Sequence, residues 1–172
     1  MLIRKLDPGT DRALVEGFFA ASADYVRLER DAEPTPELAQ DFFTDAPPGA
    51  DPATSHRVGL FGDDPNGDGP NGDTLFGSAE LSFGYPDAPA AWIGLMLIVS
   101  QARGQGAGQT LLRHLETTAR TRGASRLDLG MLAANPRGRA FWYRAGFAVA
   151  LANRPGTLGS KTRLAHRLAT PL

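Results

Sequence analysis

The chain contains no cysteine among its 172 residues. Disulfides, thiolate metal sites, cysteine nucleophiles and thiol redox chemistry are therefore excluded, and any chemistry must use oxygen and nitrogen groups. Long apolar runs are also missing, because the longest, at residues 93–99, is far too short to span a membrane. The first twenty residues carry charges where a signal peptide would have an apolar core. We therefore expect a soluble, cytoplasmic protein with no membrane partner.

Acidic residues are scarce in one half of the chain. Residues 90–172 hold 2 Asp or Glu against 12 Lys or Arg, whereas residues 1–89 hold 17 against 6, although the formal net charge is only −1. Such polarity steers charged ligands but says nothing about the fold. A chance gradient spread over solvated faces is the alternative explanation.

Length and periodicity predict one domain over residues 1–172, built from alternating strands and helices. Capping residues at Thr10 or Asp11 and at Thr35 would start the first two helices. The expected order is βααβββαβαββ, an α/β arrangement without internal repeats. Expected strands cover residues 1–6, 56–61, 75–83, 91–99, 125–132, 147–151 and 162–168; expected helices cover 12–30, 36–43, 106–122 and 136–146.

The segment 62–73 contains Pro-Asn-Gly-Asp twice, which predicts the turn of a long hairpin. Its residues from Asp64 onward also match the opening of a calcium loop. The twelfth position of such a loop requires a bidentate Glu, and here it is Leu75. We therefore expect no metal site there, nor elsewhere in the chain.

A glycine-dense loop separates the apolar strand 91–99 from the amphipathic helix 106–122. Gly104, Gly106 and Gly108 leave the loop amides uncovered next to a helix N-terminus, which suits an anion such as pyrophosphate. The loop does not match the dinucleotide-binding fingerprint, which would need a glycine where residue 109 is Gln. It does not match a nucleotide-binding P-loop either, because it contains no lysine.

This loop resembles the acyl-CoA loop of the GNAT superfamily of N-acetyltransferases, in which Arg or Gln precedes two glycine positions. Here the pattern stands as Arg103, Gly106 and Gly108, followed in register by Asn135, Phe141 and the Gly-Phe pair at 146–147. The resemblance covers about residues 75–150. It implies a mixed, mostly antiparallel sheet of six or seven strands with about four helices, in which the fourth and fifth strands splay apart.

The resemblance also implies acetyl-CoA as co-substrate. Met96 and Ile98 would offer main-chain bonds to the pantetheine arm, with the Ile98 amide as donor to the thioester oxygen. Asn135 would hold the arm, although it is equally suited to cap a helix. The pyrophosphate would lie on the loop residues Arg103, Gly104, Gln105, Gly106, Ala107 and Gly108, with Arg137 and Arg139 near it.

In this family the amine attacks the thioester directly, which suits a chain without cysteine. Glu80 is the candidate base, although an outward-facing strand Glu is as good an interpretation; Asp128 and His56 are further candidates. The usual tyrosine that meets the leaving thiolate is replaced by Trp142. Tyr143 would lie about 100° further round the helix, so Tyr143 or water would act as the acid.

The sequence thus predicts transfer of an acetyl group from acetyl-CoA to a cationic primary amine. Another acyl donor, a protein N-terminus as acceptor, and a non-catalytic acyl-CoA-binding module are the alternatives. A nucleic-acid partner is not expected, because the basic half lacks aromatic residues between its arginines. A homodimer is left open.

Overall fold

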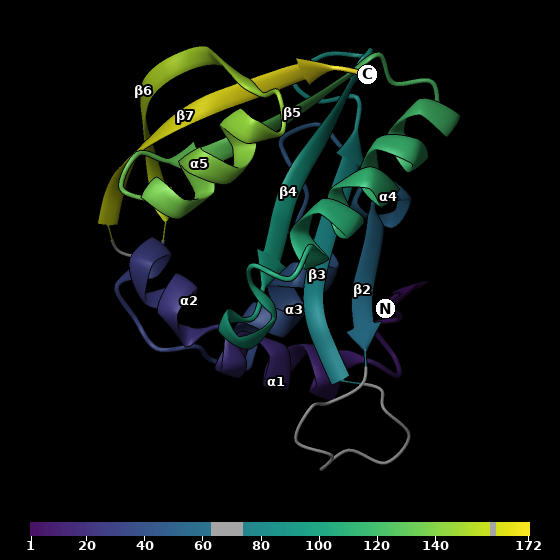
Figure 1. Ribbon diagram of the computed structural model, residues 1–172, viewed down its shortest axis with the longest axis vertical. Coiled ribbons are helices and arrows are strands. Elements are labelled where there is room, and N and C mark those ends of the chain that lie inside the picture. The colour runs from purple at the N-terminus through teal and green to yellow at the C-terminus, as the bar shows by residue number, and fades with distance from the viewer. Residues whose placement is uncertain (63–73, 159–160) are drawn as a thin grey trace.

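The computed structural model describes residues 1–62, 74–158 and 161–172, which form one seven-stranded sheet in the order β1-β2-β3-β4-β5-β7-β6 (Figure 1). All neighbouring strands are antiparallel except β4 and β5. The predicted mixed, mostly antiparallel sheet is confirmed. The strands are β1 (Leu2–Lys5), β2 (His56–Gly62), β3 (Thr74–Phe83), β4 (Ala90–Ile98), β5 (Arg126–Leu132), β6 (Ala148–Leu158) and β7 (Lys161–Pro171).

Five α-helices cover the two faces of this sheet. They are α1 (Arg12–Ala21), α2 (Ala23–Arg30), α3 (Glu37–Thr44), α4 (Ala107–Thr121) and α5 (Pro136–Arg144), with short 3₁₀ helices at Pro52–Thr54 and Ser100–Ala102. Within the described residues, no helix is both long and apolar enough to cross a membrane. The predicted hairpin turn and the rejected calcium loop fall at 63–73, outside the described residues.

The prediction of one helix over 12–30 is wrong, because Ser22 interrupts it. Ser22 has φ −106° and ψ 23°, and its N–H bonds to Phe19 O in a tight turn. Serine offers the backbone alternatives to helical bonding, so it is a weak point in such a run. The predicted side-chain cap by Asp11 is also absent, since that carboxylate accepts bonds from Arg4 and from the Asp7 amide. The break at Ser22 lets α2 run in its own direction.

The parallel pair β4–β5 is short. Ala90–Ile93 pairs with Arg126–Leu129, and then the two strands diverge, as Figure 1 shows. From Leu95 to Ile98, β4 pairs only with β3. One edge of this stretch therefore has no strand partner among the described residues, which is an uncommon state for the middle of a sheet.

A bulge stands where the divergence begins. Glu80 pairs with Leu95 and Leu81 pairs with Ile93, so Gly94 is the extra residue on β4. A bulge bends a strand and raises its twist. It therefore turns the second half of β4 away from β5.

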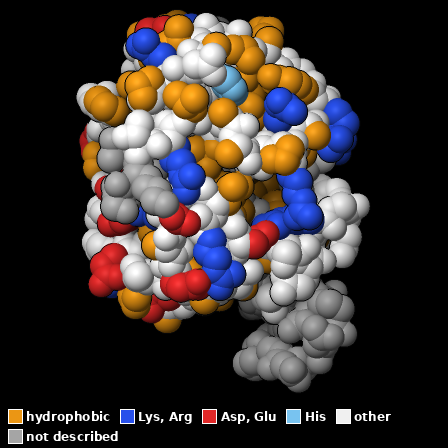
Figure 2. Space-filling view, turned by 90° about the vertical axis from the view of Figure 1, so that its left-hand side faces the viewer, with side chains coloured by type: hydrophobic (Ala, Val, Ile, Leu, Met, Phe, Trp, Pro, Cys, Tyr) orange, Lys and Arg blue, Asp and Glu red, His pale blue; other side chains and the backbone are white. Residues whose placement is uncertain are grey.

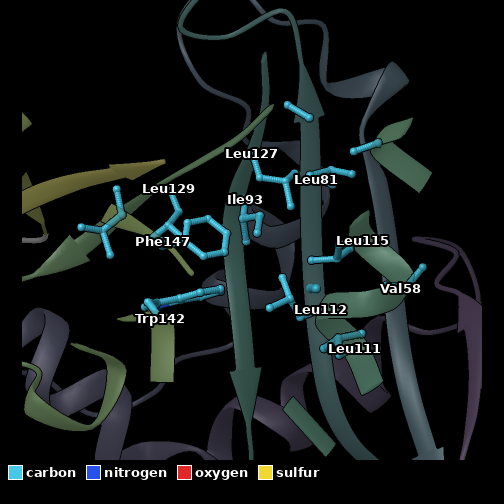
Figure 3. Packing of buried hydrophobic residues seen from close by; sticks show 14 of the residues in the cluster. Val58, Leu81, Ile93, Leu111, Leu112, Leu115, Leu127, Leu129, Trp142 and Phe147 are labelled. Carbon is cyan, nitrogen blue, oxygen red and sulfur yellow. The ribbon is translucent and has the colours of Figure 1, made fainter. Parts of the chain in front are cut away.

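Two apolar clusters hold the layers together. One packs α4 and α5 against the sheet and includes Leu112, Leu115, Ile93, Trp142 and Phe147 (Figure 3). The other packs α1–α3 against the opposite face. The helices α4 and α5 on one face, and the helices α1–α3 on the other, are thus anchored by separate apolar clusters.

The substitution Leu112→Ala should lower the free energy of unfolding by about 3 kcal/mol, because Leu112 is fully buried and its loss leaves a cavity. The matched change Leu164→Ala, at a side chain that is 52% exposed, should have almost no effect. Chemical denaturation measures both values. Equal losses in the two variants would contradict the assignment of the core.

Candidate functional site

The divergence of β4 from β5 opens a cleft of about 730 Å³. Its walls come from β4, β5, the loop 103–108, the start of α5, and α2 on the opposite side. Figure 2 shows a hollow on this side of the molecule, with cationic side chains at its rim and hydrophobic ones deeper inside. Arg103, Arg137 and Arg144 line the cleft, whereas Arg139 does not. Its size and shape suit an elongated ligand with anionic groups.

The unpaired edge of β4 faces this cleft. The Val99 amide bonds to Phe76 O on β3. Backbone groups alternate in direction along a strand, so those of Met96 and Ile98 point to the opposite edge. Ile98 O agrees with this, since it accepts a bond of 2.8 Å from Arg103 Nε on the cleft side. Both predicted main-chain ligands, Met96 and Ile98, line the cleft.

The loop before α4 carries two glycines in the left-handed conformation beside a helix N-terminus, which suits an anion-binding nest. Gly104 and Gly106 have φ values of 79° and 81°, a region that residues with side chains rarely adopt. Gly106 is also the N-cap of α4, so the first free amides of the helix lie beside the loop. Gly104, Gly106 and Gly108 line the cleft, whereas Gln105 and Ala107 do not.

Gly108 has a second reason to be glycine. A Cβ at this position would stand 3.1 Å from the ring of Phe141 on α5. The glycine therefore lets α4 and α5 approach each other at the head of the cleft. Gln105 and Ala107 are placed differently, because Gln105 bonds back to Gln101 O and Ala107 is buried in the core.

Arg103 already has partners on both sides of the cleft. Its Nε donates to Ile98 O, and its two terminal nitrogens donate to the carboxylate of Asp24 on α2. The same bond from Arg103 holds the pKa of Asp24 below its usual range. An anion that engages Arg103 must therefore compete with Asp24, which sequence reasoning did not find because 79 residues separate the two.

Asn135 caps α5 and also lines the cleft. Its Oδ1 accepts a bond of 2.9 Å from the Gly138 amide, which leaves Nδ2 to donate elsewhere. Asn135 can therefore cap the helix and bind a ligand at the same time. Trp142 on the same helix lines the cleft from its buried position. Tyr143 is 46% exposed and does not line the cleft.

Glu80 lies beneath the bulge of β4 and is 6% exposed. Ser82 Oγ donates to its Oε1 at 2.5 Å, and Ser55 and the Gly94 amide also bond to it. Burial raises the pKa of Glu80, and these bonds and the charge of Arg57 oppose the rise. The interpretation of Glu80 as an outward strand residue is excluded by its burial.

Glu80 faces a second, smaller cavity of about 230 Å³ between α1–α3 and the sheet. Tyr25, Gly94 and Leu95 line both this small cavity and the large cleft. The two spaces thus adjoin at the bulge of β4 and share these three residues as a common wall. Sequence reasoning missed Tyr25 and Gly94, because neither stands in a recognisable motif.

The other two candidate bases lie elsewhere. His56 stacks on His114 with their Nε2 atoms 3.0 Å apart, and burial beside that ring lowers the pKa of His56 to about 4. Asp128 is fully buried and paired with Arg126 and Arg167. Neither residue lines the cleft or the small cavity. No group of three or more metal-ligating side chains occurs in the described ranges.

The model of one known protein family matches most of the chain. Residues 24–147 match the family model described as the acetyltransferase (GNAT) family. No curated protein matches the chain.

Solved structures share the fold over the whole chain. An acetyltransferase from Thermus thermophilus aligns with a TM-score of 0.75 and 23% identity, over 100% of this chain and 98% of that one. A ribosomal-protein-alanine N-acetyltransferase from Brucella melitensis gives 0.68 and 19%, over 100% of both chains. A GCN5-related N-acetyltransferase from Kribbella flavida gives 0.65 and 23%, over 99% and 97%. At these identities the likeness concerns the fold alone.

Gly94→Ala should destabilise the protein by about 1–3 kcal/mol, because the added Cβ would overlap the Glu80 carboxylate. Gly130→Ala is the matched control on β5, where the Cβ would stand 3.6 Å from Trp92 in ordinary contact. Thermal unfolding compares the two variants. If Gly94→Ala were as stable as Gly130→Ala, Glu80 would not be packed against the bulge.

Proposed function

Because the chain belongs to the GNAT acetyltransferase family, we propose that it transfers an acetyl group from acetyl-CoA to a cationic primary amine. The observation that carries this proposal is the unpaired edge of β4 beside the glycine loop, with both facing one cleft. An extended amide-containing arm can bond to such an edge as an added strand would. A diphosphate can bind the amides at the start of α4.

The donor would lie along the cleft from the loop to the bulge. The amides of Gly104, Gly106 and Gly108 and the side chains of Arg137 and Arg144 would meet the phosphates. Met96 and Ile98 would bond to the pantetheine arm through their main chains. The Ile98 amide would also donate to the thioester oxygen as negative charge develops on it.

Glu80 would act as the base. Its carboxylate takes a proton from the ammonium group of the acceptor, and the neutral amine attacks the thioester carbon, forming the C–N bond. The C–S bond then breaks and the electron pair leaves on the thiolate of CoA. The bonds from Ser55 and Ser82 hold the Glu80 carboxylate in place during this step.

The second proton leaves the nitrogen as the tetrahedral intermediate collapses. Tyr143, the candidate acid, is half exposed and outside both cavities. Trp142, which does line the cleft, has only an indole N–H to offer. We therefore propose that water in the cleft accepts this second proton from the nitrogen and passes it to the departing thiolate, which leaves CoA as the free thiol.

The charge of the acceptor follows from the small cavity. Carboxylates of Glu29, Asp41, Asp45 and Glu80 line it, with Arg30 as the cation among its described lining residues. A positively charged amine is attracted by this excess of acid. The acidic half of the sequence thus supplies the acceptor side, and the basic half supplies much of the donor side.

Two alternatives are separated by a thiol-release assay with acetyl-CoA and a panel of amines. Binding of acetyl-CoA without turnover of any amine or peptide would favour a non-catalytic acyl-CoA-binding module. Turnover only with peptides would favour a protein N-terminus as acceptor. Preference for neutral or acidic amines over cationic ones would overturn the proposed acceptor class.

Gly106→Glu should abolish detectable binding of acetyl-CoA, because a carboxylate would enter the anion nest. Gly123→Glu at the opposite end of α4 is the matched control, since Gly123 has a similar φ of 83° and equally open surroundings. Calorimetric titration compares them, with circular dichroism to check the fold. Equal binding in both variants would place the diphosphate somewhere else.

Glu80→Gln should lower kcat by about 10²–10⁴-fold, because glutamine keeps the shape but cannot take a proton. In the parent protein kcat/KM should fall as the pH drops through the raised pKa of Glu80, where the carboxylate becomes protonated. The variant should lose this limb of the profile, and Glu116→Gln on α4 should keep it. A limb that persists in Glu80→Gln would assign the base to another group.

A further inference from the structure

The small cavity has the dimensions of a compact ligand. Its volume is about 230 Å³, and an apolar cavity of about 150 Å³ is enough to hold benzene. There is therefore room for one ring and a chain of about two or three atoms, but not for a folded peptide or a long polyamine. Four aromatic residues line it, namely Phe19, Tyr25, Phe42 and Trp92.

The polar groups of the cavity are unevenly placed. Glu80 lies at the bulge, where the cavity meets the cleft. Glu29 is engaged on two sides, because it accepts a bond of 3.1 Å from the Tyr25 hydroxyl and pairs with Arg30 at 3.3 Å. Burial and the neighbouring Glu29 raise the pKa of Tyr25, so this hydroxyl stays protonated and keeps donating.

A carboxylate on the ligand would meet an excess of acid here. Among the described lining residues Arg30 is the only cation, its Nε pairs with Glu29, and Asp41, Asp45 and Glu80 add three further carboxylates. Arg57 lies near Glu80, and its three guanidinium nitrogens donate hydrogen bonds to the backbone carbonyls of Phe42, Asp45 and Pro52. A ligand carboxylate would instead face Asp41 and Asp45, with the cost of an unpaired charge.

The small cavity adjoins the cleft where the reaction would take place. Tyr25, Gly94 and Leu95 line both spaces, so the shortest path from the small cavity to the unpaired edge of β4 runs past these three residues. Glu80 stands against Gly94 at this point. A primary amine at the tip of an apolar body would place its nitrogen beside the base while its body stays among the aromatic rings.

We infer that the acceptor is a compact primary monoamine with an aromatic or similarly bulky apolar body and no carboxylate. This inference rests on the function proposed above and narrows its acceptor class. The aromatic walls select the body, the volume excludes long polyamines, and the excess of carboxylates over cations disfavours free amino acids.

The sharpest test compares ligands that differ in one group. 2-Phenylethylamine and phenylalanine share the ring and the amine, and only phenylalanine carries a carboxylate; phenylalanine amide is the neutral control. In the thiol-release assay, kcat/KM for 2-phenylethylamine should exceed that for phenylalanine by about tenfold or more, with phenylalanine amide closer to the amine. A higher kcat/KM for phenylalanine, for spermidine or for a short basic peptide would overturn the inference.

A cavity-filling variant adds a second measurement. Ala46 lines the small cavity and is partly exposed, so Ala46→Phe should occupy its volume without disturbing the core. KM for 2-phenylethylamine should rise about tenfold or more, while KM for propylamine and the Kd for acetyl-CoA should change little. Ala53→Phe, at an exposed residue outside the cavity, is the matched control. Equal KM values in the two variants would contradict this assignment.

Direct binding separates failure of this inference from failure of the proposed function. Calorimetry with CoA present measures the affinity of 2-phenylethylamine without requiring acetyl transfer. Binding that Ala46→Phe abolishes, in a protein that transfers no acetyl group, would overturn the proposed reaction and keep the ligand class. Transfer to other amines, with no binding of 2-phenylethylamine, would overturn the ligand class alone.

Discussion

The rest of the structure depends on one constraint: within the described residues, the second half of β4 has a strand partner on one edge only. Residues 95–98 pair with β3 on one side, while β5 has diverged on the other. In most sheets such an interior edge would be closed by the next strand. Here the two clusters of buried residues anchor α4 and α5 on one face and α1–α3 on the other, so the opening is held without a bridging strand.

The position of Glu80 is tied to the same opening. Its carboxylate bonds to the Gly94 amide and occupies the space that a side chain at residue 94 would need. The absence of a side chain at residue 94 thus lets a buried carboxylate approach the bend. The bend and the proposed base are consequently in direct contact.

Local patterns in the sequence were sufficient to predict much of the fold. The order of strands along the chain followed from periodicity, and the glycines at 104 and 106, which were expected to leave the loop amides uncovered, have φ values of 79° and 81°. The break at Ser22 was missed, since helical periodicity continues across it. The bulge at Gly94 and the pairing of Asp24 with Arg103 depend on contacts between distant segments, which no local pattern encodes. The exposure of Tyr143 likewise depends on which face of α5 packs on the sheet.

The pairing of Arg103 with Asp24 has a thermodynamic consequence. Asp24 belongs to α2, whose Tyr25 lines both the cleft and the small cavity. A diphosphate that takes Arg103 from Asp24 removes one restraint on this helix, and a ligand of the small cavity contacts the same helix from its other side. If occupancy of one space alters the free energy of filling the other, linkage requires the two effects to be equal in size. The helix that begins after the break at Ser22 thus carries both the partner of Arg103 and residues that line the two spaces.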